Sequence, residues 1–335
     1  MLHLLCAEIG NTWALPFETD FILWLQSLGG KGTFLYYLMN FITMFGEELI
    51  LVGIMGLIYW GLDKHKGERI GFMLIFATVA NPLIKNIVCR TRPFDSASGI
   101  ENLRDVDGYS FPSGHSSGSA SVFFGTARVY RKTIKKWLTA LCIVIPLLVA
   151  LSRNYLGAHY LTDVVAGLLL GLGLVFLIDW LYTVLNKYII YLGALVIGAA
   201  GFFYCTTSDY FTGYGILVGF VCSILFEEKV VKFENTRCWW RIALRVAVGG
   251  LLFVALNEVI KLPFNNLIFT TTADGVEVIK SNMVTFERVF RTIRYAMVTF
   301  LCMGVYPLLF KPFAALWEKL AAGKQTQQQD NEEDN

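Results

Sequence analysis

The sequence has little charge, and this scarcity excludes most classes of soluble protein. Only 16 % of its 335 residues are charged, whereas 55 % are hydrophobic, and the mean hydropathy is +0.55. A water-soluble domain needs a larger polar surface than this composition provides. The formal net charge is only +2, and we expect no nucleic-acid partner. The composition is that of an integral membrane protein.

Paired cysteines and clustered carboxylates are also lacking. The seven cysteines are scattered, mostly inside apolar runs, with no C-x-x-C pair, which indicates neither a disulfide framework nor a zinc site. The acids of the polar loop, Glu101, Asp105 and Asp107, are spaced as solvated loop residues. We therefore expect no bound metal and no other cofactor.

Apolar runs of membrane-helix character begin after residue 45 and continue to residue 310. They predict an all-α, polytopic transmembrane bundle of about nine helices. The expected helices are 46–62, 69–89, 115–130, 137–151, 159–181, 188–205, 210–226, 242–260 and 293–310. Two apolar pieces between residues 19 and 45 fall short of the roughly 20 residues that a span needs. There we expect interfacial or re-entrant helices.

Clusters of lysine and arginine occupy alternate loops of this arrangement. Alternating helices place all of these clusters on one side, and the bias of basic residues toward short cytoplasmic loops makes that side the cytoplasm. The motif segments discussed next then lie on the extracytoplasmic face. We expect interfacial helices in 1–45, a core in 46–183, additional transmembrane helices in 184–311 and a cytoplasmic tail in 312–335.

Three cations stand near the predicted extracytoplasmic face. Lys85 falls in the last turn of a helix that ends near Cys89, and Arg92 begins the next loop because Pro93 favours an extended residue before it. Arg153 follows another helix. Arginine binds two oxygens at once and lysine acts as a point charge, so the three suit a tetrahedral oxyanion. For each cation taken alone, the favoured explanation is a side chain that reaches for the membrane interface.

The segment PSGH, residues 112–115, precedes the third predicted helix. Ser113 can cap this helix, and the backbone N–H groups of Ser113, Gly114 and His115 are free at its N-terminus, where phosphate binds readily. Gly114 lets the backbone approach a ligand closely, and His115 can carry a proton. In isolation the segment reads equally well as a capping turn with an interfacial histidine.

His159 and Asp163 are four residues apart at the start of the fifth predicted helix. Residues at this spacing share a helix face, so Asp163 can accept a hydrogen bond from one imidazole nitrogen of His159 and leave the other lone pair free. This arrangement suits an oriented nucleophile. The alternative is a structural ion pair, although a carboxylate near the membrane is costly and marks a functional site.

Taken in order, the three segments read K-x6-R-P, P-S-G-H and S-R-x5-H-x3-D. The series resembles the signature of the type-2 phosphatidic-acid phosphatase superfamily, which includes membrane lipid phosphatases and, as soluble relatives, vanadium haloperoxidases and bacterial acid phosphatases. Every motif position is present, and the resemblance covers about residues 46–181. It implies an integral membrane phosphatase that hydrolyses a lipid phosphate or diphosphate, of the undecaprenyl diphosphate, phosphatidic acid or phosphatidylglycerol phosphate class.

The resemblance also implies a role for each matching residue. His159 would attack phosphorus and form a phosphohistidine, Asp163 would orient His159, and His115 would protonate the leaving oxygen and then activate water. The phosphate oxygens would be held by the remaining motif residues, Lys85, Arg92, Ser113, Gly114 and Arg153. The resemblance implies no metal.

Other functions remain open at this stage. A vanadate-dependent oxidase could use the same cage of cations, but small aqueous substrates need no bilayer. The helices from 188 to 310 lie beyond the resemblance and suggest a lipid transporter or flippase, or a phosphotransferase that uses the same cage. These helices could also form a homodimer interface or guide the substrate. The glycines of the fifth predicted helix, Gly167, Gly171 and Gly173, permit close packing within one bundle as well.

Overall fold

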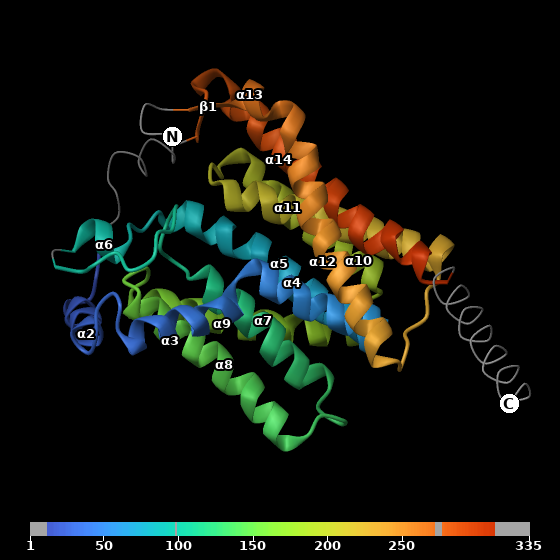
Figure 1. The fold of residues 1–335 in the computed structure, drawn as a ribbon, viewed down its shortest axis with the longest axis horizontal. Coiled ribbons are helices and arrows are strands. Elements are labelled where there is room, and N and C mark those ends of the chain that lie inside the picture. Colours follow the sequence, from blue (N-terminus) through green and yellow to red (C-terminus); the bar gives the residue numbers. More distant parts are fainter. Residues whose placement is uncertain (1–11, 98, 272–276, 312–335) are drawn as a thin grey trace, which may run out of the picture.

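The computed structural model describes residues 12–97, 99–271 and 277–311, and it consists almost entirely of helices (Figure 1). The exception within these ranges is a short antiparallel hairpin formed by β1 (Phe269–Thr271) and β2 (Glu277–Ile279). The predicted all-α membrane bundle is therefore confirmed as a fold class. The predicted cytoplasmic tail, residues 312–335, lies outside the described residues.

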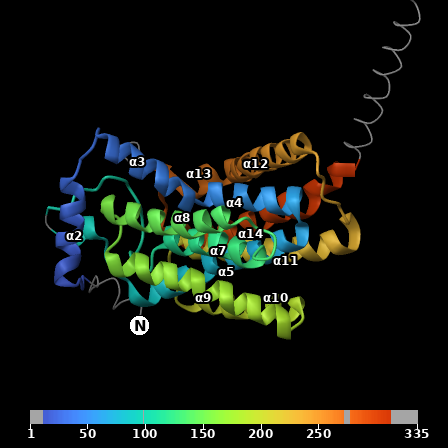
Figure 2. The ribbon, with the colours of Figure 1, turned by 90° about the horizontal axis from the view of Figure 1, so that it is seen from below.

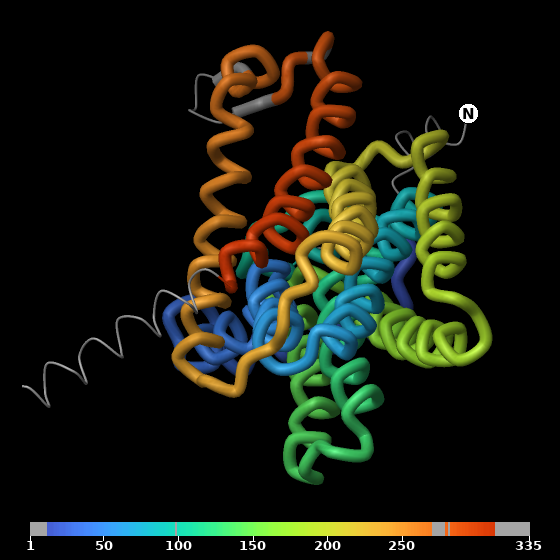
Figure 3. The backbone as a smooth tube through the Cα atoms, turned by 90° about the vertical axis from the view of Figure 1, so that its right-hand side faces the viewer, coloured from blue at the N-terminus to red at the C-terminus, as the bar shows by residue number. Residues whose placement is uncertain are grey.

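The core is built around α5. Of the most apolar 18-residue stretch of this helix, 67 % is buried. The core elements are α4 (Glu48–Gly56) with its π-helical continuation η2 (Leu57–Leu62), α5 (Lys64–Val88), α7 (Gly114–Val129), α8 (Lys136–Tyr155) and α9 (Leu161–Val184). Figure 3 shows α7 and α8 on one side of α4 and α5, and α12 and α14 on the other. The short α6 (Pro93–Ser96) begins the polar loop.

The C-terminal half adds a second layer of helices to this core. Its elements are α10 (Lys187–Ala199), η3 (Ala200–Phe203), α11 (Ser208–Phe226), η4 (Glu227–Val231), α12 (Trp239–Lys261), η5 (Leu262–Phe264), α13 (Asn265–Ile268), η6 (Ser281–Met283), α14 (Val284–Phe300), η7 (Leu301–Val305) and η8 (Tyr306–Leu309). The helix α11 contacts both α5 and α14 and so joins the two layers. By contrast, α12 is apolar, and only 6 % of the most apolar 18-residue stretch in Trp239–Ile268 is buried. This exposure suits a lipid-facing helix.

The N-terminal helices lie at one end of the bundle. Helix α2 (Pro16–Ser27) runs across that end, at a steep angle to the core helices (Figure 2). Helix α3 (Phe34–Thr43) continues through η1 (Met44–Gly46) and meets α4 at a bend of 52°. The crosswise α2 is the arrangement that an interfacial helix would adopt.

The predicted number of nine membrane spans is not confirmed. Within the described ranges, five helices are long and apolar enough to cross a membrane, or six if the bent pair of α3 and α4 counts as one span. Helix α7 shows the reason, because its 16 residues rise only roughly 24 Å, short of the ~30 Å of hydrocarbon. The short α10, even with η3, falls below the required length too.

Two glycines of α9 fix its close packing against α7. A Cβ on Gly167 would lie 2.5 Å from the backbone oxygen of Ser113, and one on Gly171 would lie 2.6 Å from the Cβ of Ala120. No side chain fits there, so the start of α7 lies directly against α9. These glycines serve packing inside the bundle, whereas a Cβ on Gly173 would meet nothing within 4 Å.

Ion pairs join the helix ends that lie farthest from the motif segments. Asp179, near the end of α9, binds Arg69 at 2.7 Å and Arg128 at 2.9 Å. Lys64, at the start of α5, binds Glu227 at 2.9 Å. These pairs bring the start of α5 together with the ends of α7, α9 and α11. Among the described residues, the basic residues of these helix ends thus lie at the opposite end of the bundle from the motif segments, as the alternation of helices predicts.

One cysteine departs from the expectation that no disulfide is present. Cys89, the left-handed residue that ends α5, is disulfide-bonded. The irregular spacing along the sequence gave no sign of this pairing, because disulfides depend on proximity in space. The free cysteines of the described residues are Cys142, Cys205, Cys222, Cys238 and Cys302.

Candidate active site

The motif residues converge at the end of the bundle that α2 crosses. His159 lies in the loop between α8 and α9, and four charged or titratable side chains are close enough to act on it electrostatically: Arg92, Arg153, Lys85 and His115. These side chains come from the end of α5, the start of α6, the start of α7 and the end of α8. The structure therefore brings the three predicted segments together around one histidine.

Ser110 connects His159 to Asp163. The Ser110 hydroxyl donates to Asp163 Oδ2 at 2.5 Å and lies 3.3 Å from His159 Nδ1. The direct distance between His159 Nδ1 and Asp163 Oδ2 is 3.7 Å, too long for the predicted direct hydrogen bond. The difference arises because α9 begins only at Leu161, so Asp163 Oδ2 accepts from the backbone N–H of Tyr160 at 2.8 Å. Sequence reasoning missed Ser110, which lies outside the motif.

The second imidazole nitrogen of His159 faces Arg92, at 3.3 Å from Nη1. Because a guanidinium only donates, this Nε2 carries the lone pair, and the proton is on Nδ1, which can donate to Ser110. Burial, and then the positive charges of Arg92 and Arg153, hold the pKa of His159 well below its usual value. These surroundings favour the neutral form of the ring.

Arg92 is fixed by backbone carbonyls of the polar loop and of the connection between α8 and α9. Its side chain is buried and donates to the carbonyl oxygens of Asp107 at 2.6 Å, Gly108 at 3.0 Å and Ala158 at 2.9 Å. Arg92 is extended, as predicted for a residue that precedes proline. The loop thus holds this cation beside His159.

Arg153 and Lys85 complete the positive surroundings. Arg153 is fully buried and donates from Nη1 to Thr43 at 3.2 Å, but its Nε has no partner. A buried guanidinium N–H without a partner is costly, and an anionic ligand would relieve that cost. Lys85 Nζ lies 3.3 Å from the carboxylate of Asp209, at the start of α11. The C-terminal layer therefore reaches the candidate site.

The PSGH segment caps α7 as predicted, but one of the three backbone N–H groups expected to bind phosphate is hydrogen-bonded within the protein. Ser113 is the N-cap and accepts from the backbone N–H of Ser116 at 3.4 Å. The N–H of Ser113 itself donates to the backbone oxygen of Asp163 at 3.0 Å, so it is not free for phosphate. A Cβ on Gly114 would meet only Asn81 Oδ1, at 3.8 Å, so protein packing does not require glycine there.

His115 lies beside Glu47, a residue that the sequence did not single out. His115 Nε2 is 3.2 Å from Glu47 Oε1, without the geometry of a hydrogen bond. The same carboxylate oxygen accepts from Arg104 at 2.5 Å. The sequence feature that could have indicated Glu47 is the pair of adjacent acids, Glu47 and Glu48, at the start of a predicted span.

A buried ionic network supports Asp163 from behind. Arg90 Nη1 binds Asp163 Oδ1 at 2.5 Å, and Arg90 Nη2 binds Glu18 Oε2 of α2 at 3.0 Å. All three side chains are fully buried. The guanidinium also lies 3.7 Å from the ring centroid of Trp13 and 4.1 Å from that of Tyr160. Sequence reasoning missed this network, because Arg90 stands at a variable position of K-x6-R-P.

In the part of the chain that the structure describes, no group of three or more His, Cys, Asp and Glu side chains could hold a metal ion. The charge beside His159 comes from arginine and lysine side chains.

Comparisons with known proteins identify the family. The sequence profile described as PAP2 superfamily matches residues 68–189, and one described as PAP2 superfamily phosphatase, transmembrane extension, matches 211–319. The chain is 34 % identical to phosphatidylglycerophosphatase B of Bacillus subtilis over 42 % of this chain and 71 % of that protein. It is 22 % identical to human sphingosine-1-phosphate phosphatase 2 over 86 % of this chain and 79 % of that protein.

A solved structure is also similar. It is the crystal structure of a transmembrane PAP2 type phosphatidylglycerolphosphate phosphatase from Bacillus subtilis, with a TM-score of 0.44 and 27 % identity. The match covers 56 % of this chain and 94 % of that one. By its sequence matches, the chain belongs to the PAP2 superfamily. It is a multi-pass integral membrane lipid phosphatase.

Proposed function

We propose that this phosphatase hydrolyses a lipid phosphate monoester or diphosphate through a phosphohistidine on His159. One observation carries the proposal: the imidazole has its Nδ1 directed through Ser110 to Asp163 and its Nε2 beside the Arg92 guanidinium. An anion bound by Arg92 would therefore meet the lone pair of a neutral, oriented nucleophile.

In the first step, the Nε2 lone pair of His159 forms a bond to phosphorus while the bond from phosphorus to the lipid oxygen breaks. The leaving oxygen takes a proton from His115, which must be protonated at this stage. Positive charge that develops on the His159 ring is balanced through Ser110 by the carboxylate of Asp163. The products of this step are the lipid alcohol, or the lipid monophosphate if the substrate is a diphosphate, and the phosphohistidine.

In the second step, the now neutral His115 accepts a proton from water, and the water oxygen attacks phosphorus. The bond between phosphorus and His159 Nε2 breaks, which releases inorganic phosphate and restores both histidines. Arg92, Arg153 and Lys85 stabilise the charge on the phosphoryl oxygens in both steps. The unpartnered Nε of Arg153 supports its part in this role.

Two observations support an extracytoplasmic location for the site. The basic helix ends lie at the opposite end of the bundle, and basic loops favour the cytoplasm. Cys89, three residues before Arg92, is disulfide-bonded, and disulfides persist in oxidising compartments outside the cytosol. The substrate would then meet the site from the outer leaflet of the cell membrane.

We place the substrate among lipid phosphates with a long apolar tail, a class that includes undecaprenyl diphosphate, phosphatidic acid, phosphatidylglycerol phosphate and sphingoid phosphates. The relatives named above act on phosphatidylglycerophosphate and sphingosine 1-phosphate, as their names state. We assign catalysis to residues 46–183 and an auxiliary role to residues 184–311, with the ion pair of Asp209 and Lys85 as the polar link between them.

The test measures phosphate release from a panel of these lipids by purified protein in detergent with EDTA present. His159→Ala should abolish release, and brief incubation of the wild type with a 32P-labelled lipid should trap an acid-labile phosphoprotein that the variant lacks. His65→Ala, a substitution of an exposed histidine at the start of α5, serves as the matched control and should keep full activity. Turnover by the His159→Ala variant would rule out the phosphohistidine.

A further inference from the structure

Glu47 precedes α4 directly, but its carboxylate does not serve that helix. The residue is the N-cap of α4, and its side chain makes no capping hydrogen bond. Glu47 Oε1 instead lies 3.2 Å from His115 Nε2 and accepts a hydrogen bond from Arg104 of the polar loop at 2.5 Å. The carboxylate is therefore directed at the histidine that would donate a proton to the leaving oxygen.

Close packing between α7 and the chain around the start of α4 places Glu47 there. A Cβ on Gly46, the residue before Glu47, would lie 2.9 Å from His115 Cβ. Farther along the two helices, a Cβ on Gly118 of α7 would lie 3.1 Å from Leu51 Cδ1 of α4. A side chain at Gly46 would displace the histidine, so glycine allows the backbone before Glu47 to lie against the imidazole.

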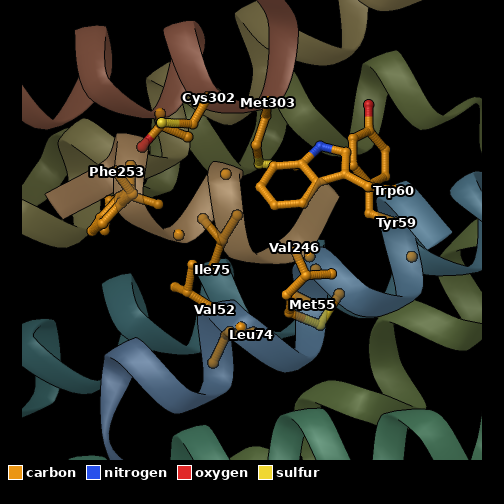
Figure 4. A pocket seen from close by; sticks show the side chains of 18 of the residues that line it. Val52, Met55, Tyr59, Trp60, Leu74, Ile75, Val246, Phe253, Cys302 and Met303 are labelled. Carbon is orange, nitrogen blue, oxygen red and sulfur yellow. The ribbon is translucent and has the colours of Figure 1, made fainter. Parts of the chain in front are cut away.

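The side of α4 that faces α12 packs less tightly. An apolar cavity of about 100 Å³ lies there, and Figure 4 shows Val52 of α4 and Val246 and Phe253 of α12 around it. Neither Glu47 nor His115 lines this cavity. The position of Glu47 is therefore set by its contacts with α7 and the polar loop.

The exposed edge of the His115 ring is the edge that carries Nδ1. Nε2 is buried beside Glu47, and Cδ2 would lie 3.1 Å from a Cβ on Gly46, yet 21 % of the side chain is exposed. The exposed part therefore includes the opposite edge of the ring. Protonation gives both ring nitrogens a hydrogen, which makes an aligned contact between Nε2 and the carboxylate favourable.

The cations of the site oppose protonation of this ring. Arg153 of α8 and Arg104 of the polar loop act on His115 with positive charge, whereas Glu47 acts on it with negative charge. His159 also interacts with His115. A general acid has to carry a proton at the start of each cycle. An imidazolium beside two arginines is unfavourable unless a carboxylate balances it.

We propose that Glu47 is a positioning residue for the general acid: its carboxylate holds Nε2–H of the protonated His115 ring, so that Nδ1–H protonates the leaving oxygen. The inference rests on the proposed function, because it takes His115 to be the proton donor. When Nδ1 gives up its proton, the ring becomes neutral and keeps the proton on Nε2. The Nδ1 lone pair then accepts a proton from the attacking water, which restores the ion pair with Glu47.

The experiment compares Glu47→Gln with Glu101→Gln, the same change at an exposed residue of the polar loop. The probes are hexadecyl phosphate, whose leaving group is an alkoxide, and hexadecyl diphosphate, whose leaving phosphate has a second pKa of ~6 and needs little protonation. For Glu47→Gln, kcat/KM should fall about tenfold or more with the monophosphate. The loss with the diphosphate should be less than about threefold, and Glu101→Gln should stay within about twofold of wild type with both.

A pH profile and a double variant show whether Glu47 acts through His115. The alkaline limb of kcat/KM for hexadecyl phosphate should move to lower pH in Glu47→Gln, because a neutral amide does not stabilise the imidazolium. His115→Ala should lower kcat/KM by about 10²- to 10⁴-fold. Adding Glu47→Gln to that variant should change kcat/KM by less than about twofold.

The outcomes separate this inference from the proposed function. Equal losses with the two probes, or additive losses in the double variant, would overturn the positioning role while the phosphatase function stands. If wild type hydrolyses neither probe nor any other lipid phosphate, the proposed function fails. The 15N NMR titration of His115 without substrate then still tests Glu47. A lower midpoint in Glu47→Gln than in wild type supports the inference, and equal midpoints overturn it.

Discussion

Replacing Ser110 by alanine is the sharpest test of how the nucleophile is oriented. The hydroxyl is fully buried, donates to Asp163 at 2.5 Å and accepts from His159 Nδ1 at 3.3 Å. A hydrogen bond to a charged group is worth about 1.5–3 kcal/mol. The Ser110→Ala variant should therefore lose about 10- to 100-fold in kcat. KM should change less than about threefold, because Ser110 is not among the groups that we place on the phosphate.

The assay is initial phosphate release with EDTA, combined with 15N NMR of the histidine rings. The Nδ1–H tautomer of His159 should be the main form in wild type and should lose its preference in Ser110→Ala. Ser119→Ala is the matched control, since Ser119 is equally buried but donates to a helix carbonyl of α7 at 3.2 Å. A Ser110→Ala enzyme with more than about a third of wild-type kcat would refute the bridging role.

Three further predictions concern the surroundings of the site. Arg90→Met leaves two buried carboxylates without their cation. The free energy of unfolding, measured by thermal unfolding in detergent, should therefore fall by about 3–5 kcal/mol. Because the pKa of His159 is lowered by burial and nearby cations, the acid limb that protonation of this ring causes in a pH profile of kcat/KM should lie below pH ~6.5. Activity should then fall as the ring gains a proton. Asp209→Asn frees Lys85 from a partly exposed partner, so KM in steady-state assays should fall by less than about fivefold.

Each of these predictions has its own contrary result. Arg128→Met changes an ion pair at the opposite end of the bundle whose arginine is partly exposed, and it should lower the free energy of unfolding by less than about 1 kcal/mol. An equal loss for both arginine variants would contradict the stabilising role of the buried network around Arg90. An acid limb above pH ~6.5 would mean that His159 is not the group that must be neutral. A rise in KM for Asp209→Asn would mean that the carboxylate places Lys85 for binding and does not compete with phosphate.

The sequence predicted those features of the site that depend on residues close by in the chain. Pro93 fixes Arg92 in an extended conformation, Ser113 caps the helix that follows it, and the end of α5 near Cys89 delivers Lys85. These features depend on neighbours within a few residues, which a single sequence displays. The assembly of the segments at one end of the bundle followed from alternating the helices.

The missed residues act across long separations. Glu18 and Arg90 are 72 residues apart in the sequence, and Lys85 and Asp209 are 124 apart. Nothing in local spacing identifies such partners. The predicted span count was not confirmed for a different reason. Helix α7 is short and rich in small residues, and it is held by contact with α9 at Gly167. Its place inside the bundle could not be read from hydropathy alone.

The course of α2 has a consequence for anyone who shortens or tags this protein. Glu18 enters the bundle from that crossing helix and meets Arg90 behind the carboxylate of Asp163. A version that starts at residue 30 would leave Arg90 without Glu18. A bulky fusion that displaces α2 would disturb the carboxylate of Asp163 through the same arginine. Helix α2 is therefore a structural part of the support of Asp163.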